Sequence, residues 1–438
     1  MAGSGRLTIG LSLAALVAST WVGAQTGGGA EHWVGTWATA VVSSQQTFTL
    51  PAFLLKRFTP PPAPPGGAPP PPLPPPDLQA ISNQTLREIV HTSLGGSRFR
   101  VVFTNEFGTK PLRIAASRIA LRTTDSASAP GSGAALMFAG QPSVTIPAGA
   151  PMVSDPVNFT APPFADLAID AYVPGDTTGS PLTLHGSAMQ TSYLSETGDH
   201  SGQSPFPVAR PIASWYLLSR VEVVAPSSVG AVVTFGDSIT DGTASTGNAN
   251  HRWPDDLARR LASMTGGPMG VLNLGIAGNR LLSDGLGIGA LARFDRDVTS
   301  QSGITHMTLL EGINDIGFGG DDASPTAAEL ISAHQQLIAR AHARGLKVFG
   351  ATLTPFEGAL YQTAVGEAKR QEVNKWIRSS GSYDGLIDFD AVVRDPGHQT
   401  RPRAAFDSGD HLHFTDAGYQ AMSDAIDLGF FKPPARRQ

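Results

Sequence analysis

The stretch Val232-Val-Thr-Phe-Gly-Asp-Ser-Ile-Thr-Asp-Gly242 is the most informative part of this 438-residue chain. An apolar, β-branched run ends abruptly in Gly-Asp-Ser, which is typical of a buried strand that presents a serine at its end. Far along the chain, Asp410-His-Leu-His413 holds a carboxylate and an imidazole three residues apart, so both side chains can point the same way. A serine hydroxyl becomes a useful nucleophile when a histidine takes its proton and a carboxylate fixes the tautomer of that histidine. The two segments therefore supply the three residue types of a serine hydrolase.

After Pro226 the sequence predicts strands that alternate with helices. Apolar runs predict five strands, at Val229–Phe235, Val271–Leu274, Met307–Leu310, Leu346–Leu353 and Gly385–Phe389. Capping residues and apolar stripes predict helices that begin at Pro254 and Ser324-Pro325, and further helices at Val365–Arg378 and Asp416–Leu428. Five strands alternating with helices predict an α/β fold with a parallel, doubly wound, flavodoxin-like sheet. Ligands bind beyond the carboxyl ends of the strands in such sheets, and Ser238 lies there.

The sequence from Trp33 to about Ala225 has a different pattern, with short alternating segments between turn residues and no convincing helix. Such segments lie at Arg98–Thr104, Leu112–Ile114, Ser117–Arg122, Val144–Ile146, Leu167–Val173 and Tyr216–Val224. Many short strands with turn signals predict an all-β sandwich or jelly-roll-like domain. Because a single core stops growing at roughly 250–300 residues, we expect a β-rich domain over residues 30–225 and a catalytic domain over residues 226–432.

Residues 60–76 are proline nearly throughout. Such a run forms neither a helix nor an interior strand, and it predicts extended polyproline II or disorder. Strand-like sequence flanks it at Phe48–Phe58 and Gln84–Thr92, so we interpret it as a surface loop inserted into the β-rich domain. A docking site for a proline-recognising partner is the alternative interpretation.

The N-terminus carries the features of an export signal. Arg6 provides a positive charge, Leu7–Val22 is an almost uncharged apolar run, and Val22-Gly-Ala24 offers small residues for cleavage. The run is shorter than the ~20 residues of a membrane-spanning helix. We therefore expect a signal peptide over residues 1–24, a secreted or periplasmic protein, and no stable membrane insertion. Cysteine is absent, which excludes disulfides and thiolate metal sites. A net charge of only -5, with no dense basic stripe, argues against a nucleic-acid partner.

Two further turns follow predicted strands, Asn273-Leu-Gly-Ile-Ala-Gly278 and Gly312-Ile-Asn-Asp315. The oxyanion of a tetrahedral intermediate needs two or three hydrogen-bond donors. A glycine lets a backbone N–H approach without interference from a Cβ atom, and an asparagine amide can provide another donor. These turns are therefore candidates for an oxyanion hole.

Four blocks with compatible spacing, carried by Ser238, Gly278, Asn314 and His413, resemble those of the SGNH/GDSL hydrolases. The resemblance covers about residues 229–428 and implies the SGNH hydrolase fold. It implies that Ser238 is the nucleophile and that its backbone N–H is one oxyanion donor. Gly278 then corresponds to a second backbone donor, and Asn314 to a donor through its side-chain amide. His413 corresponds to the general base, with Asp410 as the acid that orients it. We expect neither a cofactor nor a metal.

Three shorter motifs look like those of a bacterial exported subgroup of this family: Arg252-Trp-Pro-Asp255, Gly278-Asn-Arg280 and Asp416-Ala-Gly-Tyr419. That subgroup bears a β-rich N-terminal region, which here begins near Trp33-Val-Gly-Thr-Trp37. One departure is Phe414, where the subgroup often has proline. We expect it to alter the approach of the final helix and to leave the neighbouring histidine ring in place.

Other residues near these blocks are alternatives for the same roles. Gly275 is the alternative backbone donor. His411 is the alternative base, although it directly follows the orienting acid, and neighbouring side chains point apart in most backbones. Asp407 is the alternative orienting acid. Asp237 and Asp315 are expected to hold loops together through local hydrogen bonds.

Two further patterns resemble a metal-binding pair and a nucleotide-binding loop, but neither has the sequence context that such a site needs. The His411-x-His413 pair lacks a third clustered ligand, so we do not expect a metal site. Gly285-Leu-Gly-Ile-Gly289 mimics a nucleotide-binding loop, but it follows no clear strand and opens no strong helix. We expect a mobile loop near the pocket instead.

These features predict an exported serine esterase that hydrolyses carboxylic esters through an acyl-enzyme on Ser238. Export suits small-molecule or polysaccharide-linked esters, such as short-chain acyl esters or acetylated glycans, and the shallow sites implied by the resemblance favour short acyl groups. The β-rich domain could shape the rim of the pocket, bind glycan or act only as a structural partner. Two alternatives are an acyltransferase with the same triad and a non-catalytic glycan-binding protein on this scaffold. The sequence sets no oligomeric state.

Overall fold

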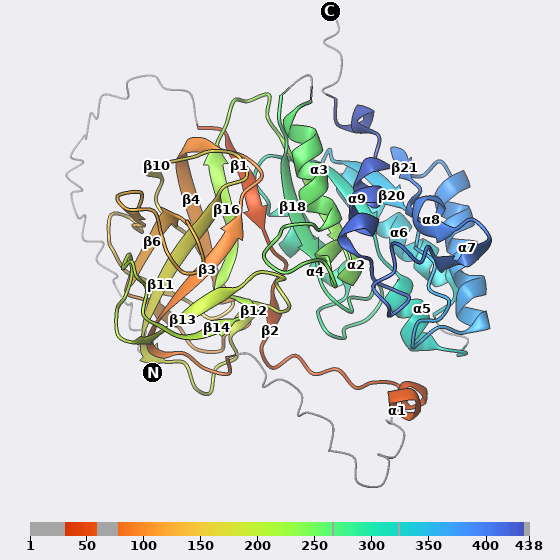
Figure 1. Cartoon of the computed structure of the whole chain (residues 1–438), viewed down its shortest axis with the longest axis horizontal. Coiled ribbons are helices and arrows are strands. Elements are labelled where there is room, and N and C mark those ends of the chain that lie inside the picture. The colour runs from red at the N-terminus through yellow and green to blue at the C-terminus, as the bar shows by residue number, and fades with distance from the viewer. Residues whose placement is uncertain (1–30, 59–77, 265–266, 323–324, 433–438) are drawn as a thin grey trace, which may run out of the picture. The chain divides into compact units, whose positions relative to one another are not determined.

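Five parallel strands form the sheet of the C-terminal half in the computed structural model (Figure 1). They are β17 (Ala231–Gly236), β18 (Gly270–Gly275), β19 (Ile304–Leu310), β20 (Lys347–Ala351) and β21 (Gly385–Ile387), in the order β18-β17-β19-β20-β21. Every residue of β17 is buried, as expected for an inner strand of a parallel sheet. The predicted doubly wound, flavodoxin-like fold is therefore confirmed, and a ligand site is expected beyond the carboxyl end of β17.

The structure describes residues 31–58, 78–264, 267–322 and 325–432. The predicted signal peptide over residues 1–24 and the proline-rich run over residues 60–76 lie outside these ranges. No helix within them is long and apolar enough to cross a bilayer.

Helices connect the parallel strands. They are α2 (Ser238–Asp241), α3 (Trp253–Ala262), α4 (Ala290–Phe294), the π-helix η1 (Asp295–Thr299), α5 (Ile313–Gly319), α6 (Ala327–His342), α7 (Ala364–Ser379), α8 (Phe389–Val393), α9 (Asp416–Asp424) and the 3₁₀-helix η2 (Leu428–Phe431), with a small hairpin of β22 (Arg394–Asp395) and β23 (His398–Pro402). α6 begins later than predicted, because Thr326 and Glu329 form a capping box in front of Ala327. α9 ends before the predicted Leu428, because Asp427 caps a separate 3₁₀ turn by accepting the N–H of Gly429.

Antiparallel sheets make up the N-terminal half, as predicted. The strands are β1 (Trp33–Ala38), β2 (Val42–Ser43), β3 (Ser82–His91), β4 (Gly96–Thr104), β5 (Leu112–Ile114), β6 (Ala116–Leu121), β7 (Ala134–Ala135), β8 (Val144–Ile146), β9 (Pro151–Val153), β10 (Val157–Ala161), β11 (Asp166–Asp176), β12 (Thr183–His185), β13 (Ser192–Thr197), β14 (Val208–Ile212), β15 (Trp215–Tyr216) and β16 (Leu218–Val224). The two largest sheets contain the orders β1-β16-β4-β10 and β14-β13-β3-β11-β6-β7. Phe99, Val101 and Phe103 of β4 are buried in the same hydrophobic core as Leu86 of β3 and Ile169 of β11.

The segment Phe48–Phe58 is not a strand, so this prediction was wrong. Its second part is the helix α1 (Ala52–Phe58), and its first part has no regular structure. Pro51 explains the difference, because it has no N–H to give to a strand ladder. Its carbonyl instead accepts the N–H groups of Leu54 and Leu55 in a helical turn. In Figure 1 this segment leaves β2 and ends at α1, away from the antiparallel sheets.

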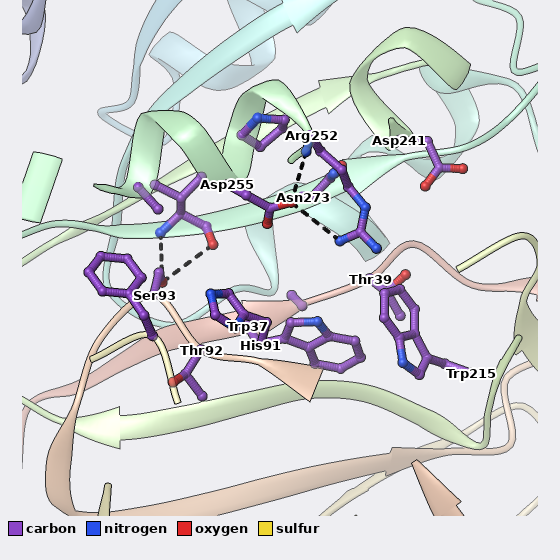
Figure 2. A pocket seen from close by; sticks show the side chains of 15 residues that line it. Trp37, Thr39, His91, Thr92, Ser93, Trp215, Asp241, Arg252, Asp255 and Asn273 are labelled. Atoms are coloured by element: carbon purple, nitrogen blue, oxygen red, sulfur yellow. Dashed lines mark hydrogen bonds and ion pairs between the residues drawn. The ribbon is translucent and has the colours of Figure 1, made fainter. Parts of the chain in front are cut away.

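The β-rich region packs directly against the α/β region, and the chain from His32 onward forms one compact unit. Figure 2 shows the residues around a small cavity of about 30 Å³ at this contact, which has room for about one water molecule. The rings of Trp37 and Trp215 lie 4.9 Å apart on the β-rich side, and the Arg252 guanidinium carbon lies 5.5 Å from the Trp215 ring centroid. Ser93 Oγ accepts the N–H of Val271 at 3.0 Å. These contacts hold the edge strand β18 and the start of α3 against the β-rich region.

Candidate active site

A tight turn after β17 brings Ser238 to the first position of α2. Asp237 caps this helix, because its Oδ1 accepts the N–H of Ile239 at 2.9 Å. Only glycine fits at Gly236, since a Cβ atom there would lie 2.7 Å from the carbonyl oxygen of Leu310. Ser238 is 4% exposed and lines a cavity at the carboxyl end of the sheet.

Ser238, His413 and Asp410 form one hydrogen-bonded series. His413 Nε2 lies 2.8 Å from Ser238 Oγ, and His413 Nδ1 lies 2.5 Å from Asp410 Oδ2. Because a carboxylate only accepts, the proton of the neutral imidazole belongs on Nδ1, which leaves Nε2 to accept the serine proton. Asp410 Oδ1 also accepts the backbone N–H groups of Leu412 at 2.9 Å and His413 at 2.8 Å. The turn around Asp410 therefore sets the position of the carboxylate and, through it, the tautomer of the ring.

The charge state of Asp410 suits this role. Partial burial raises the pKa of its carboxyl group. The hydrogen bond to the His413 ring and the two backbone N–H bonds lower this pKa, and their combined effect is larger than that of burial. The net effect holds the pKa of Asp410 well below its usual range. The carboxyl group of Asp410 is therefore ionised at neutral pH.

Three hydrogen-bond donors are available beside Ser238. In the described part of the chain, the backbone N–H groups of Ser238 and Gly278 donate to no recorded acceptor. The side-chain nitrogen of Asn314 donates one proton to the carbonyl of Asn279 at 2.9 Å, and its amide oxygen accepts the Tyr361 hydroxyl at 3.2 Å. The second amide proton of Asn314 remains for a ligand. The three groups line one cavity, so they can converge on the oxyanion of a tetrahedral intermediate.

The alternative residues named from the sequence are engaged elsewhere. His411 Nδ1 pairs with Asp407 Oδ2 at 2.5 Å, and neither residue lines the cavity at Ser238. The His411 ring lies over Gly358, where a Cβ atom would meet it at 2.8 Å. The N–H of Gly275 donates to the side chain of Asn273 at 3.0 Å. The loop that carries His413 thus holds another Asp–His pair, which does not line the cavity at Ser238.

Two buried carboxyl groups hold the loops around the site. Asp315 accepts the N–H groups of Leu281 at 2.7 Å and Leu282 at 3.1 Å, which fixes the chain beyond the second block. Burial raises the pKa of Asp315 to about 6, although these two bonds lower it. Burial also raises the pKa of Asp237 to about 7, against the lowering effect of its own backbone hydrogen bond.

A fully buried arginine beneath the site is not predicted by the sequence. The guanidinium of Arg293 donates to the carbonyls of Gly236 at 3.0 Å and Leu274 at 2.9 Å, and to Asn279 Oδ1 at 2.8 Å. It also lies 3.3 Å from Glu311. Arg293 therefore joins the ends of β17 and β18 to the loop that carries the second block. Its position in α4 gives no local sign of this, since nothing near it in sequence marks the charge as buried.

The β-rich region reaches the site through His185. Its Nε2 lies 3.0 Å from Asp241 Oδ1, and its Nδ1 lies 2.7 Å from the carbonyl oxygen of Ala40. Asp241 Oδ2 in turn accepts the N–H of Ala277 at 3.1 Å. A chain of hydrogen bonds therefore connects β12 to the residue before Gly278. The sequence offers no signal for it, because the partners lie far apart along the chain.

A cavity of about 650 Å³ opens at Ser238. Besides Thr243 and the predicted site residues Ser238, Gly278, Asn314, Asp410 and His413, it is lined by Phe48, Leu50, Leu54, Ala277, Leu286, Phe318, Ala359, Leu360, Tyr361 and Leu412. Its wall is thus mainly apolar. Leu286 places the Gly285–Gly289 loop at the pocket, whereas the mobility of this loop stays a prediction. Among the described residues, no three His, Asp or Glu side chains are grouped so as to hold a metal ion.

Replacing Asn314 by alanine is expected to lower kcat for ester hydrolysis by about 10²–10³-fold, because one oxyanion donor is lost. Tyr361→Phe removes only the hydroxyl that orients the amide, so we expect a loss of roughly three- to tenfold. KM should stay nearly constant in both variants, since these bonds strengthen in the transition state. Steady-state kinetics with p-nitrophenyl butanoate measures both effects. An unchanged kcat in Asn314→Ala would remove this residue from the oxyanion hole.

The free energy of unfolding is expected to depend on pH through Asp237. The pKa of about 7 of its buried carboxyl group exceeds the ~3.9 of aspartate in an unfolded chain. A raised pKa in the folded acid means that its contribution is fully present below about pH 4 and is lost as the pH rises through about 7. Asp237→Asn cannot ionise and keeps the oxygen that caps α2. Its stability relative to the wild type should therefore rise between about pH 4 and pH 8, by an amount on the order of a few kcal/mol.

Urea unfolding of both proteins across this pH range measures that difference. The comparison near pH 4 is the internal control, because the folded wild type is protonated at Asp237 there. A difference that stays constant across the range would mean that Asp237 does not titrate as its burial predicts.

This chain is similar to known proteins over part of its length. The GDSL-like Lipase/Acylhydrolase family matches residues 234–421. A catalytic mutant of an acetylxylan esterase from Geobacillus stearothermophilus is 19% identical, with 48% of this chain and 100% of that chain covered and a TM-score of 0.37. A carbohydrate acetylesterase from Sinorhizobium meliloti is 17% identical, with coverages of 45% and 96% and a TM-score of 0.35. An aryl esterase from M. smegmatis is 16% identical, with coverages of 45% and 95% and a TM-score of 0.36. The comparison with curated proteins found no match.

Proposed function

We propose that this protein is a serine esterase that cleaves carboxylic esters through an acyl-enzyme on Ser238, because residues 234–421 match the GDSL-like Lipase/Acylhydrolase family. One observation carries the proposal. Ser238 Oγ lies 2.8 Å from a ring nitrogen of His413, whose other nitrogen pairs with Asp410. This order of nucleophile, base and orienting acid is the one that serine hydrolases with a Ser–His–Asp triad use for acyl transfer.

The first half of the reaction forms the acyl-enzyme. Ser238 Oγ attacks the ester carbonyl while His413 Nε2 takes its proton, and the ionised Asp410 stabilises the imidazolium that results. The N–H groups of Ser238 and Gly278 and the amide of Asn314 hold the oxyanion. His413 then gives its proton to the leaving alcohol, and the tetrahedral intermediate collapses to the acyl-serine.

The second half repeats these steps with water. His413 removes a proton from the water that attacks the acyl-serine, and the same three donors hold the second oxyanion. Ser238 leaves with the proton that His413 returns, and the carboxylic acid is released. No further group is needed for this chemistry.

We propose short-chain acyl esters as the substrates, with acetylated-glycan esters as the second class. The apolar wall of the cavity supports the first class, because an acyl chain can remove it from water. We also propose that the protein is exported, on the strength of Arg6 and the apolar run Leu7–Val22.

Hydrolysis of p-nitrophenyl acetate and butanoate, together with labelling by a fluorophosphonate, tests the proposed function. We expect turnover of both esters and a mass increase of one phosphonyl group on the wild-type protein. An acceptor alcohol in the assay separates hydrolysis from transfer, since an acyltransferase would convert most of the acyl group into a new ester. A protein that neither hydrolyses these esters nor reacts with the fluorophosphonate is not a serine esterase.

A further inference from the structure

A segment of the β-rich region forms part of the cavity at Ser238. This segment, residues 44–58, is here called the arm. It begins after β2, where the N–H of Ser44 donates to the carbonyl of Leu182 at 2.8 Å. Further on, the side chain of Gln46 donates to the carbonyl of Gly285 at 2.8 Å. Near the end of the arm, Arg57 donates to the carbonyl of Leu360 at 2.5 Å. The arm is thus attached to both regions. One of its contacts is with Leu360, which lines the cavity, and another is with Gly285, which precedes the lining residue Leu286.

Three apolar side chains of the arm face the cavity. They are Phe48, Leu50 and Leu54, and Leu54 is only 1% exposed. The Phe48 ring lies 4.8 Å from the ring of Phe318, which belongs to the same helix as Asn314. The arm therefore closes the apolar part of the pocket on the side of α5, and residues from outside the matched family region supply that wall.

The reaction geometry indicates which part of the ester lies against the arm. The leaving oxygen must lie next to His413, because this ring gives it a proton. Asp410 beside His413 has a half-exposed side chain, so that edge of the site is polar and open to solvent. Phe318 lies on the same helix as Asn314, and Phe48 packs against its ring. The acyl chain, which points away from the leaving group, is the part that can reach them.

We propose that the arm is the outer wall of an acyl-binding pocket and that this pocket selects unbranched apolar acyl chains, butanoyl to octanoyl, over acetyl. This inference rests on the proposed serine esterase function. A cavity of about 650 Å³ lies in the size range of pockets that bind drug-sized ligands, roughly 300–1,000 Å³. A single acetyl methyl leaves most of the apolar wall in contact with water. Each further methylene removes part of that wall from water and raises kcat/KM roughly fourfold.

A chain-length series of p-nitrophenyl esters, from acetate to octanoate, tests the proposal on the full-length protein. We expect kcat/KM to rise by about 15-fold from acetate to butanoate, and further to hexanoate. The arm variant Phe48→Ala/Leu50→Ala should lower kcat/KM for hexanoate by about tenfold and leave that for acetate nearly unchanged. Thr49→Ala is the matched control, because this exposed residue lies between the two on the arm and does not line the cavity.

The ratio of the hexanoate and acetate values decides the outcome, because a loss of stability alone would lower both. An unchanged ratio in the arm variant, or a wild type that prefers acetate, would overturn the role of the arm while acetate turnover still supports the esterase. Alkyl acetates with longer alcohols are the second series. If the arm variant affects these instead, the wall belongs to the leaving group and the acyl assignment is wrong. A protein without turnover of any ester, and without fluorophosphonate labelling, would overturn both proposals.

Discussion

Ser238→Ala is expected to lower kcat for ester hydrolysis by roughly 10⁴–10⁶-fold. The loss is this large because the variant has no atom that can carry the acyl group. Residual turnover would come from the oxyanion donors and from substrate binding, which do not need the hydroxyl. The substitution removes one buried hydroxyl group. The hydrogen bonds that the backbone carbonyl of Ser238 accepts at α2 do not involve this side chain. The variant should therefore fold like the wild type.

Covalent labelling gives the second measurement for this variant. A fluorophosphonate should add one phosphonyl group to the wild type and none to Ser238→Ala, as intact-protein mass spectrometry would show. Ser245→Ala is a suitable control, since Ser245 is another buried serine shortly after α2 and does not line the cavity. Labelling that survives in Ser238→Ala would assign the nucleophile to another residue.

Asp410→Asn is expected to lower kcat by about 10⁴-fold. Asp410 accepts hydrogen bonds from the ring of His413 and from two backbone N–H groups. An asparagine amide would offer its own N–H to the ring, which favours the tautomer with the proton on Nε2. That tautomer cannot accept the proton of Ser238. The variant should keep its fold and lose the base.

The pair formed by Asp407 and His411 provides a control, because it is also a carboxylate that contacts a histidine ring. Asp407 and His411 are joined by the same kind of 2.5 Å contact, but they do not line the cavity. Asp407→Asn should therefore leave kcat nearly unchanged, although it removes a carboxylate only three residues away. Comparable losses in the two variants would mean that the effect comes from the loop and not from the tautomer of His413.

The fold was largely predictable, because its signals are local. Strands such as β17 are continuous apolar runs, and the first turn of α3 contains a proline and two acidic residues. The parallel direction of the strands follows from their alternation with helices. The segment Phe48–Phe58 was predicted wrongly. Its β-branched and aromatic residues suggested a strand, but a helix begins directly after Pro51, whose carbonyl accepts the first helical hydrogen bonds.

The predicted site residues come together, whereas their supporting residues do not appear in the sequence pattern. Ser238 and His413 belong to recognisable blocks, and the structure places their side chains in hydrogen-bond contact. Arg293, Tyr361 and His185 hold those blocks in place, but each one acts on a residue that is far from it along the chain. Whether a charge or a hydroxyl group is buried depends on the tertiary packing around it, so no short sequence motif predicts its burial.

The contact between Ser93 and Val271 has a consequence for how the two halves depend on each other. The N–H of Val271 lies on the outer edge of the parallel sheet, and the hydroxyl from the β-rich half occupies it. Bare sheet edges recruit strands from other molecules. At this point of the edge, the N-terminal half occupies a backbone group that a strand from another molecule could otherwise bind. Since one cluster of buried apolar residues also includes residues of both halves, we expect the stability of each half to depend on the presence of the other.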